Sequence, residues 1–306
     1  MKKVVIVIVI LANLFKVNAQ QDVMVSQYMF NGLFINPAYA GSHKFFSSSL
    51  TYRKQWVNFP GAPTTYLLAV DGPLLKQKMG VGLILANDKI GVTNQTDIYA
   101  NYSYFLKMGE GKLGLGLKGG VSQYTAKVSD LIVVDANDPT YSSAVKKSLL
   151  PKFGFGTYYY TQKWFVGISI PELLAGNQKQ DFNVTVSPSS TIRSHYYLNG
   201  GYVFKVNEMW NLKPTFLLKK EKAAPLQADV SLTVYYMNTL ALGLTYRSKD
   251  AVTVMFVAQI NKQFRFGYAY DITTSTIKRY AKGSHELMLG YIFGKDVIKT
   301  VTPRFF

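Results

Sequence analysis

The stretch that decides the fold reads KQFRFGYAYDI at residues 262–272 and, after the polar loop TTSTIKRYAKGS, HELMLGYIF at residues 285–293. Both arms alternate bulky residues with small or polar ones, and a period of two is the signature of a β-strand. The bulky face is formed by Phe264, Phe266, Tyr268, Tyr270, Leu287, Leu289, Tyr291 and Phe293. The stretch therefore predicts a β-hairpin with one strongly apolar, aromatic face.

The two faces of this hairpin are the reverse of those in a soluble sandwich, which buries its large residues and exposes its charge. An aromatic-rich face opposite a small, polar or charged face is typical of a wall that faces lipid and encloses a polar lumen. The last strand also ends on an aromatic residue, Phe293. The sequence predicts an all-β fold, a transmembrane antiparallel β-barrel of a bacterial outer membrane.

The rest of the chain divides into strands in the same way, by alternation and turn residues. About fourteen segments result, an even number, and most are close to the length of a tilted membrane strand. The predicted strands cover residues 45–53, 64–71, 79–88, 96–107, 112–127, 151–160, 163–170, 192–206, 210–220, 226–236, 239–248, 251–260, 263–272 and 284–293.

The connections between these strands alternate in length, as expected for short periplasmic turns and longer outer loops. The tight class comprises residues 108–111, 161–162, 206–209, 237–238 and 261–262, and the longer class comprises 54–63, 89–95, 128–150, 171–191, 221–225 and 273–283. Two connections break the rule: the outer turn 249–250 is short, and the periplasmic link 72–78 is long. A soluble sandwich has no reason to sort its loops by parity, so the sorting favours the barrel.

The chain ends are predicted to lie outside the barrel wall. Lys2 and Lys3 precede an apolar run that ends in Val17-Asn18-Ala19, which indicates a secretory signal peptide over residues 1–19, cleaved before Gln20. Residues 20–43 lack clean alternation, so we expect a lead-in that lies in the periplasm or enters the barrel mouth. The barrel itself is assigned to residues 44–294, and residues 295–306 form a periplasmic tail.

The chain is basic, with a formal net charge of +17 and no cysteine. A basic balance fits nucleic acid, an anionic membrane or an acidic protein. The export signal argues against nucleic acid, which leaves outer-membrane lipid and lipopolysaccharide, and acidic envelope proteins. Lysines gather on the predicted periplasmic turns, where they are either ordinary solvated turn residues or a basic rim for an acidic partner: Lys76, Lys78, Lys107, Lys112, Lys163, Lys205 and Lys262.

Motifs for cofactors, metals or catalysis are weak. The glycines Gly114, Gly116 and Gly119 satisfy G-x-G-x-x-G but lie inside an alternating segment, so we interpret them as lumen-facing positions and expect no cofactor. The histidines are isolated, and residues 135–139 form only a partial calcium loop, so no metal is expected. A serine hydrolase would need a serine such as Ser103, Ser231 or Ser284 beside a histidine, and no catalytic residue is predicted.

Charged residues at inward or near-rim phase are expected to pair across the lumen, because exposure to lipid at the membrane midplane costs about 2–4 kcal/mol. They are Arg53, Asp97, Lys118, Asp229, Arg265 and Glu286. Arg265 and Glu286, on the two arms of one hairpin, are the specific candidate ion pair. Such charges either brace a plugged barrel or line a selectivity filter, and both interpretations stay open.

Five motifs carry a resemblance to a known family. They are NPAYAGS at residues 36–42, YRKQW at 52–56, PGAPTT at 60–65, GYAYDI at 267–272 and GSHELMLGY at 283–291. Together they resemble the PorP/SprF family of outer-membrane proteins from the type IX secretion and gliding systems of Bacteroidetes. The family motif residues are Asn36, Pro37, Ala38, Tyr39, Gly41, Tyr52, Arg53 and Trp56.

The resemblance implies an integral outer-membrane component that is not an enzyme. It implies two protein partners: a large secreted surface protein, typically an adhesin with a C-terminal sorting domain, and periplasmic components of the secretion machinery. Candidate docking residues on the outer loops are Trp56, Phe59, Tyr141, Phe182, Arg279 and Tyr280. Two other classes stay open: a passive channel or uptake barrel for small or hydrophobic solutes, and a membrane-embedded hydrolase.

Overall fold

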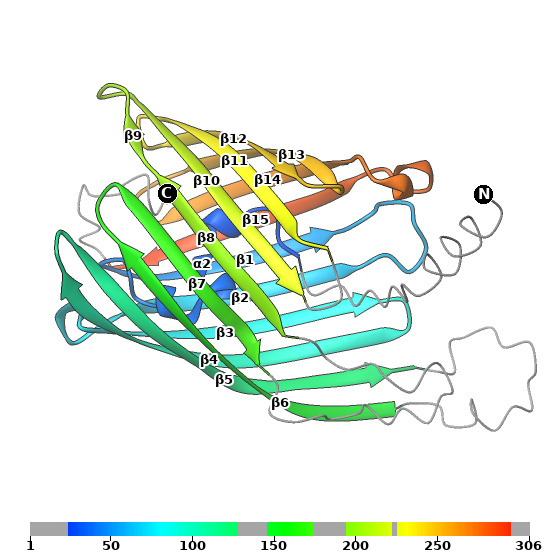
Figure 1. Ribbon diagram of the computed structural model, residues 1–306. Coiled ribbons are helices and arrows are strands. Elements are labelled where there is room, and N and C mark those ends of the chain that lie inside the picture. The colour runs from blue at the N-terminus through cyan, green and yellow to red at the C-terminus, as the bar shows by residue number, and fades with distance from the viewer. Residues whose placement is uncertain (1–23, 128–145, 174–193, 222–224, 295–306) are drawn as a thin grey trace, which may run out of the picture.

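The computed structural model describes residues 24–127, 146–173, 194–221 and 225–294 (Figure 1). The predicted signal peptide (residues 1–19) and tail (residues 295–306) lie outside these ranges, as do residues 135–139, Tyr141 and Phe182. No helix in the described part of the chain has the length and apolarity of a membrane span.

The described strands form one closed antiparallel barrel, because the first strand pairs with the last as well as with the second. The strands are β1 (Phe46–Lys54), β2 (Thr64–Leu74), β3 (Met79–Ile90), β4 (Thr93–Met108), β5 (Gly111–Ala126), β6 (Lys146–Tyr160), β7 (Trp164–Leu173), β8 (His195–Tyr202), β9 (Phe204–Lys205), β10 (Trp210–Glu221), β11 (Gln227–Tyr236), β12 (Leu240–Arg247), β13 (Ala251–Gln259), β14 (Phe264–Thr273) and β15 (Ser284–Phe293). β8 and β9 both pair with β10 and are two pieces of one wall strand interrupted at Val203. The barrel therefore has fourteen wall strands, as the sequence predicts.

The two ends of the barrel differ in the length of their connections. Tight turns at one end, here called the inner end, join β4 to β5, β11 to β12 and β13 to β14, whereas the longer connections β1–β2 and β14–β15 lie at the opposite, outer end (Figure 1). Two predicted lengths are wrong because the strands continue past their expected ends. The inner link 72–78 shrinks to the 3-10 turn η3 (Leu75–Gln77), and the outer loop 89–95 shrinks to Gly91 and Val92 between β3 and β4.

The bulky residues of the C-terminal hairpin face away from the lumen, as predicted. Phe264 is 50% exposed and Leu289 is 55% exposed, whereas Glu286, Met288 and Asp271 are buried. Exposed Trp164 and Trp210 lie at the inner ends of their strands, where aromatic side chains suit a membrane–water boundary. The outward apolar surface is what a lipid-facing wall requires.

Residues 24–43 fill the lumen and are here called the plug. They contain η1 (Tyr28–Phe30), the single-turn helix α2 (Gly32–Ile35) and η2 (Pro37–Tyr39), drawn in dark blue inside the barrel in Figure 1. Most plug side chains are buried, although the segment has neither strand periodicity nor a long helix. Of the two sequence expectations for this lead-in, the structure selects the one in which it enters the barrel.

Glycines on the wall let the plug backbone approach closely. A Cβ on Gly80 would overlap the carbonyl of Ala40, and a Cβ on Gly116 would overlap the backbone of Ala38. The lumen-facing interpretation of Gly116, and of Gly114 beside it, is therefore confirmed. It is wrong for Gly119, where a Cβ would point to the exposed ring of Phe153, because Lys118 takes the inward position.

Candidate functional site

The NPAYAGS motif holds the plug to the wall. The Asn36 side chain accepts a hydrogen bond from the Ala38 N–H (2.9 Å) and thereby caps η2, whose first residue is Pro37. Its amide nitrogen donates to the carbonyl of Thr157 on β6 (2.9 Å). One side chain thus shapes the turn and ties it to the wall.

The second half of the motif continues this attachment on the neighbouring strands. The ring of Tyr39 packs edge-on against Tyr158 with centroids 5.6 Å apart, and Ser103 on β4 donates to the carbonyl of Ala40 (2.6 Å). Gly41 adopts φ +65°, a conformation that favours glycine, and its N–H donates to Asp71 on β2 (2.8 Å). The motif residues are therefore intramolecular contacts of the plug.

Arg53 is the centre of an ion-pair cluster that binds the start of the plug. Its guanidinium lies 2.7 Å from Asp271 and 3.3 Å from Glu286, and it also donates to the Ser26 hydroxyl (2.8 Å). Glu286 accepts the backbone N–H groups of Ser26 (2.7 Å) and Gln27 (2.8 Å). Every one of these groups is buried, so the single guanidinium and the two carboxylates depend on one another and on the plug rather than on solvent.

Glu286 forms its ion pair with Arg53 and not with Arg265, the candidate that the sequence suggested. Arg265 lies opposite Gly290, four residues along β15 from Glu286, which is about 13 Å along an extended strand. Its guanidinium packs over the ring of the plug residue Phe30, 5.7 Å from the centroid. Arg53 takes the expected role because it faces Glu286 directly across the β1–β15 closure, a register that hairpin spacing does not reveal.

A second buried cluster braces the opposite side of the lumen. Lys152 lies 2.8 Å from Glu172 and 3.9 Å from Asp97, and Tyr99 bonds to Glu172 (3.2 Å). The ammonium of Lys118 sits 3.9 Å above the ring of Tyr99. The sequence placed Asp97 and Lys118 inward but missed Lys152 and Glu172, whose inward phase on β6 and β7 is the signal that could have found them.

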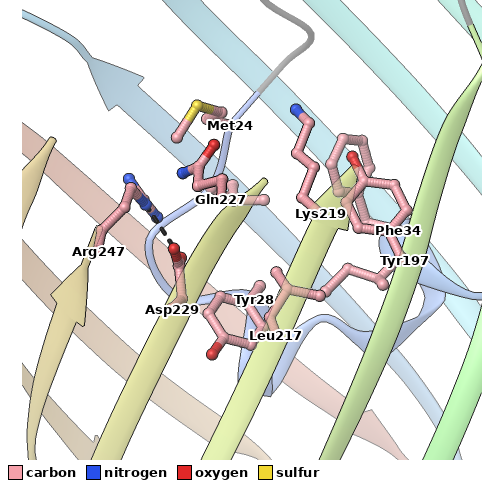
Figure 2. Close-up of a pocket in the computed structure, with 11 residues that line it drawn as sticks. Met24, Tyr28, Phe34, Tyr197, Leu217, Lys219, Gln227, Asp229 and Arg247 are labelled. Atoms are coloured by element: carbon pink, nitrogen blue, oxygen red, sulfur yellow. Dashed lines mark hydrogen bonds and ion pairs between the residues drawn. The ribbon is translucent and has the colours of Figure 1, made fainter. Parts of the chain in front are cut away.

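Two small cavities lined by described residues lie between plug and wall. The larger cavity offers about 30 Å³ to water-sized molecules, enough for a few waters, and lies between the plug and strands β8, β10, β11 and β12 (Figure 2). Figure 2 shows the ion pair of Asp229 with Arg247 (3.0 Å) at one side and Lys219 at the other. At the plug face of this cavity, burial raises the pKa of Tyr28 to about 12, so its hydroxyl stays protonated.

The contact between Ser47 and His43 does not have the geometry of a catalytic relay. His43 is 2.9 Å from Asp71 and 3.4 Å from the Ser47 hydroxyl, but both contacts use Nε2, while Nδ1 donates to the carbonyl of Phe45. A relay needs the carboxylate and the serine on opposite ring nitrogens. The named candidates bond elsewhere: Ser103 to the plug, Ser231 to Thr245 and Ser284 to the backbone of Trp56.

A metal centre is likewise not formed by the described residues. No group of three or more His, Cys, Asp or Glu side chains among them is placed to hold an ion. His195 instead lies 3.5 Å from Glu221, and His285 shares a hydrogen bond with Tyr268 (2.7 Å).

The candidate docking residues that the structure describes lie at the outer end. Phe59 is 39% exposed and Tyr280 is 71% exposed, and Arg279 is exposed beside Tyr280 in the 3-10 turn η6 (Thr276–Arg279). Trp56 packs edge-on against Phe59, with centroids 6.4 Å apart.

Fold and site together define an integral outer-membrane β-barrel whose lumen is closed by its own N-terminal segment. The family described as "Type IX secretion system membrane protein PorP/SprF" matches residues 17–291, so this chain belongs to the PorP/SprF family. A search of curated proteins finds no match.

Solved structures with a similar fold are outer-membrane barrels. Omp33 of Acinetobacter baumannii is 7% identical and matches with a TM-score of 0.50 over 83% of this chain and 100% of its own. A Pseudomonas aeruginosa FadL homologue is 12% identical, with a TM-score of 0.50 over 87% and 94%. The CymD monoaromatic hydrocarbon channel is 12% identical, with a TM-score of 0.50 over 86% and 92%. At these identities the likeness concerns the fold alone.

Proposed function

We propose that this type IX secretion component acts without catalysis and supports the secretion or surface anchoring of one large surface protein, an adhesin with a C-terminal sorting domain. Membership of the PorP/SprF family supports this role. The observation that carries it is the plug: the buried Arg53–Glu286 cluster and the NPAYAGS contacts fasten it in the lumen. A barrel closed in this way works through its rims rather than by passing a protein through its centre.

The inner rim is the proposed contact for periplasmic secretion components. Exposed lysines on its turns outnumber its exposed acids, Glu110 and Glu208, and an acidic partner would complement them. The exposed inner-rim lysines are Lys76, Lys78, Lys107, Lys163, Lys205 and Lys262. Membrane lipid and lipopolysaccharide are the proposed partners of the aromatic wall.

Deletion of the gene is expected to remove one large protein from the cell surface. The test compares surface-exposed proteins of the deletion strain and of the same strain complemented with the full chain. Loss of one such protein, restored on complementation, is the expected result. A deletion strain with an unchanged set of surface proteins and an altered solute uptake would contradict the proposal and favour the channel alternative.

The alternative function, a passive channel, predicts that the wild-type barrel conducts, whereas the plugged structure predicts that it does not. Because Asn36, Ala40 and Gly41 bond the plug to the wall, and the two cavities lined by described residues are small, the wild-type barrel in a planar bilayer is expected to stay closed. A variant without residues 24–43 is expected to conduct, since the wall alone encloses a wide polar lumen. Steady conductance of the wild-type barrel equal to that of the deletion variant would contradict a fixed plug.

A further inference from the structure

Backbone hydrogen bonds fasten the outer loops to one another. Val57, in the β1–β2 loop, donates its N–H to the carbonyl of Gly283 (2.9 Å), and Lys282 donates to the carbonyl of Val57 (2.8 Å). These two bonds join the β1–β2 loop to the β14–β15 loop across the seam where the barrel closes. Neither bond depends on a side chain.

The same kind of bond extends this surface in both directions. Thr274 donates to the carbonyl of Asp250 (2.8 Å) in the β12–β13 turn, and Gly91 in the β3–β4 turn donates to the carbonyl of Gly61 (2.9 Å). We call residues 55–63, 91–92, 248–250 and 274–283 the outer platform. Its four segments, from distant parts of the chain, are held in one arrangement before any partner arrives.

Exposed charge on the outer platform and the strand ends that border it is of one sign. The exposed charged residues there are all cations: Lys89, Lys127, Lys249, Lys278, Arg279 and Lys282. The acidic residues of the same region pair with arginines: Asp250, with 26% of its side chain exposed, lies 3.6 Å from Arg247, and buried Asp271 binds Arg53. The barrel thus neutralises its acids internally and presents cations outside.

Aromatic side chains stand among these cations. Tyr280 projects from η6 with most of its surface exposed, between Arg279 and Lys282 in the sequence, and Phe59 is partly exposed on the adjoining loop. Rigid aromatic side chains with nearby arginine are typical anchors of protein interfaces. Because the loop backbone is already ordered, a partner would bind without a large cost in conformational entropy.

We infer that the outer platform is the docking surface for an acidic face of the secreted surface protein, an inference that rests on the proposed function. The charge selects an acidic partner, and the aromatic residues select a protein. A lipopolysaccharide phosphate would satisfy the cations, but it offers no apolar surface to an exposed ring on a loop that rises from the membrane wall. Electrostatic attraction would speed association and make it depend on salt.

The test reverses three charges of the platform: Lys278→Glu, Arg279→Glu and Lys282→Glu in one full-length variant. The backbone bonds of residue 282 do not involve its side chain, so the barrel is expected to assemble, which heat-modifiable migration checks. The probe is the surface protein lost on gene deletion, bound to purified barrel in detergent. Binding is expected to weaken at least about tenfold, with a smaller dependence on salt than in the wild type.

A matched control carries the same three-fold charge reversal at the inner end, Lys107→Glu, Lys163→Glu and Lys205→Glu. The purified assay contains no periplasmic component, so this control is expected to bind the surface protein as the wild type does. Tyr280→Ala is a second variant, expected to weaken binding with an unchanged salt dependence.

The outcomes separate this inference from the proposed function. If deletion of the gene removes no surface protein, the proposed function is wrong. If it removes one, but the platform variant still binds that protein as the wild type does, only the docking surface is wrong. If the platform variant loses bound lipopolysaccharide but still binds the surface protein, the platform is a lipid site and the inference is wrong.

Discussion

Arg53→Met is expected to lower the free energy of unfolding by about 3–5 kcal/mol, because it removes the cation that lies between two buried carboxylates and leaves near them only Arg247, 4.0 Å from Asp271. Asp271 and Glu286 both lie within 3.3 Å of the guanidinium, and all three side chains are buried. Glu286 also accepts the backbone N–H groups of Ser26 and Gln27, so the start of the plug is expected to loosen as well.

The measurement is the denaturant midpoint of the purified barrel in detergent, together with heat-modifiable migration. Lys89→Met, which removes an exposed cation, serves as the control and is expected to leave the midpoint unchanged. A triple variant, Arg53→Met, Asp271→Asn and Glu286→Gln, is expected to recover part of the loss since no charge is left unpaired. An unchanged midpoint for Arg53→Met alone would show that the cluster does not stabilise the barrel.

Glu286→Lys reverses the charge of a carboxylate in the same cluster. It sets a second cation against Arg53 and removes the acceptor for the N–H groups of Ser26 and Gln27. Assembly and the amount of protein at the cell surface are therefore expected to fall. Wild-type migration and surface level in this variant would contradict the assignment of Glu286.

Gly116→Val is expected to unseat the plug. A side chain at this position would overlap the backbone of Ala38, and overpacking of this kind costs about 1–3 kcal/mol or more. The strand itself tolerates valine well, so the barrel wall is expected to form while the plug is displaced. In planar bilayers the variant is expected to conduct ions, whereas the wild type stays closed.

The same strand provides the control for this experiment. At Gly119 a Cβ would meet the Phe153 ring at 3.8 Å, an ordinary contact on the lipid-facing side. Gly119→Val is therefore expected to remain closed and to keep the wild-type unfolding midpoint. Equal conductance of the two variants would mean that close packing against Ala38 does not hold the plug.

The interpretation of the NPAYAGS motif changes once the plug is in place. In the sequence alone the motif indicates a family, and its proline and glycine predict a turn in a lead-in loop. In the structure, Asn36 and Ala40 bond to β6 and β4, and Gly41 bonds to β2. A motif outside the barrel strands thus fixes the state of the lumen.

By itself the sequence determined the wall. Successive residues of a strand point to opposite faces, so the pattern from Phe264 to Phe293 predicts which face of the wall contacts lipid. The same parity yields the fourteen strands and the inward position of Asp97, Asp229 and Glu286. Applied strictly, it also places Gly119 outward with Leu115 and Leu117, where the structure has it.

Only the tertiary structure decided the partners of the inward charges and the position of the plug. Alternation states the face of each residue but not the register between strands, and Arg53 meets Glu286 only because closure sets β1 beside β15. The plug has no period to detect, because its short turns are held by contacts with the lumen rather than by a repeating pattern. Long-range contacts of this kind exist only once the barrel has closed.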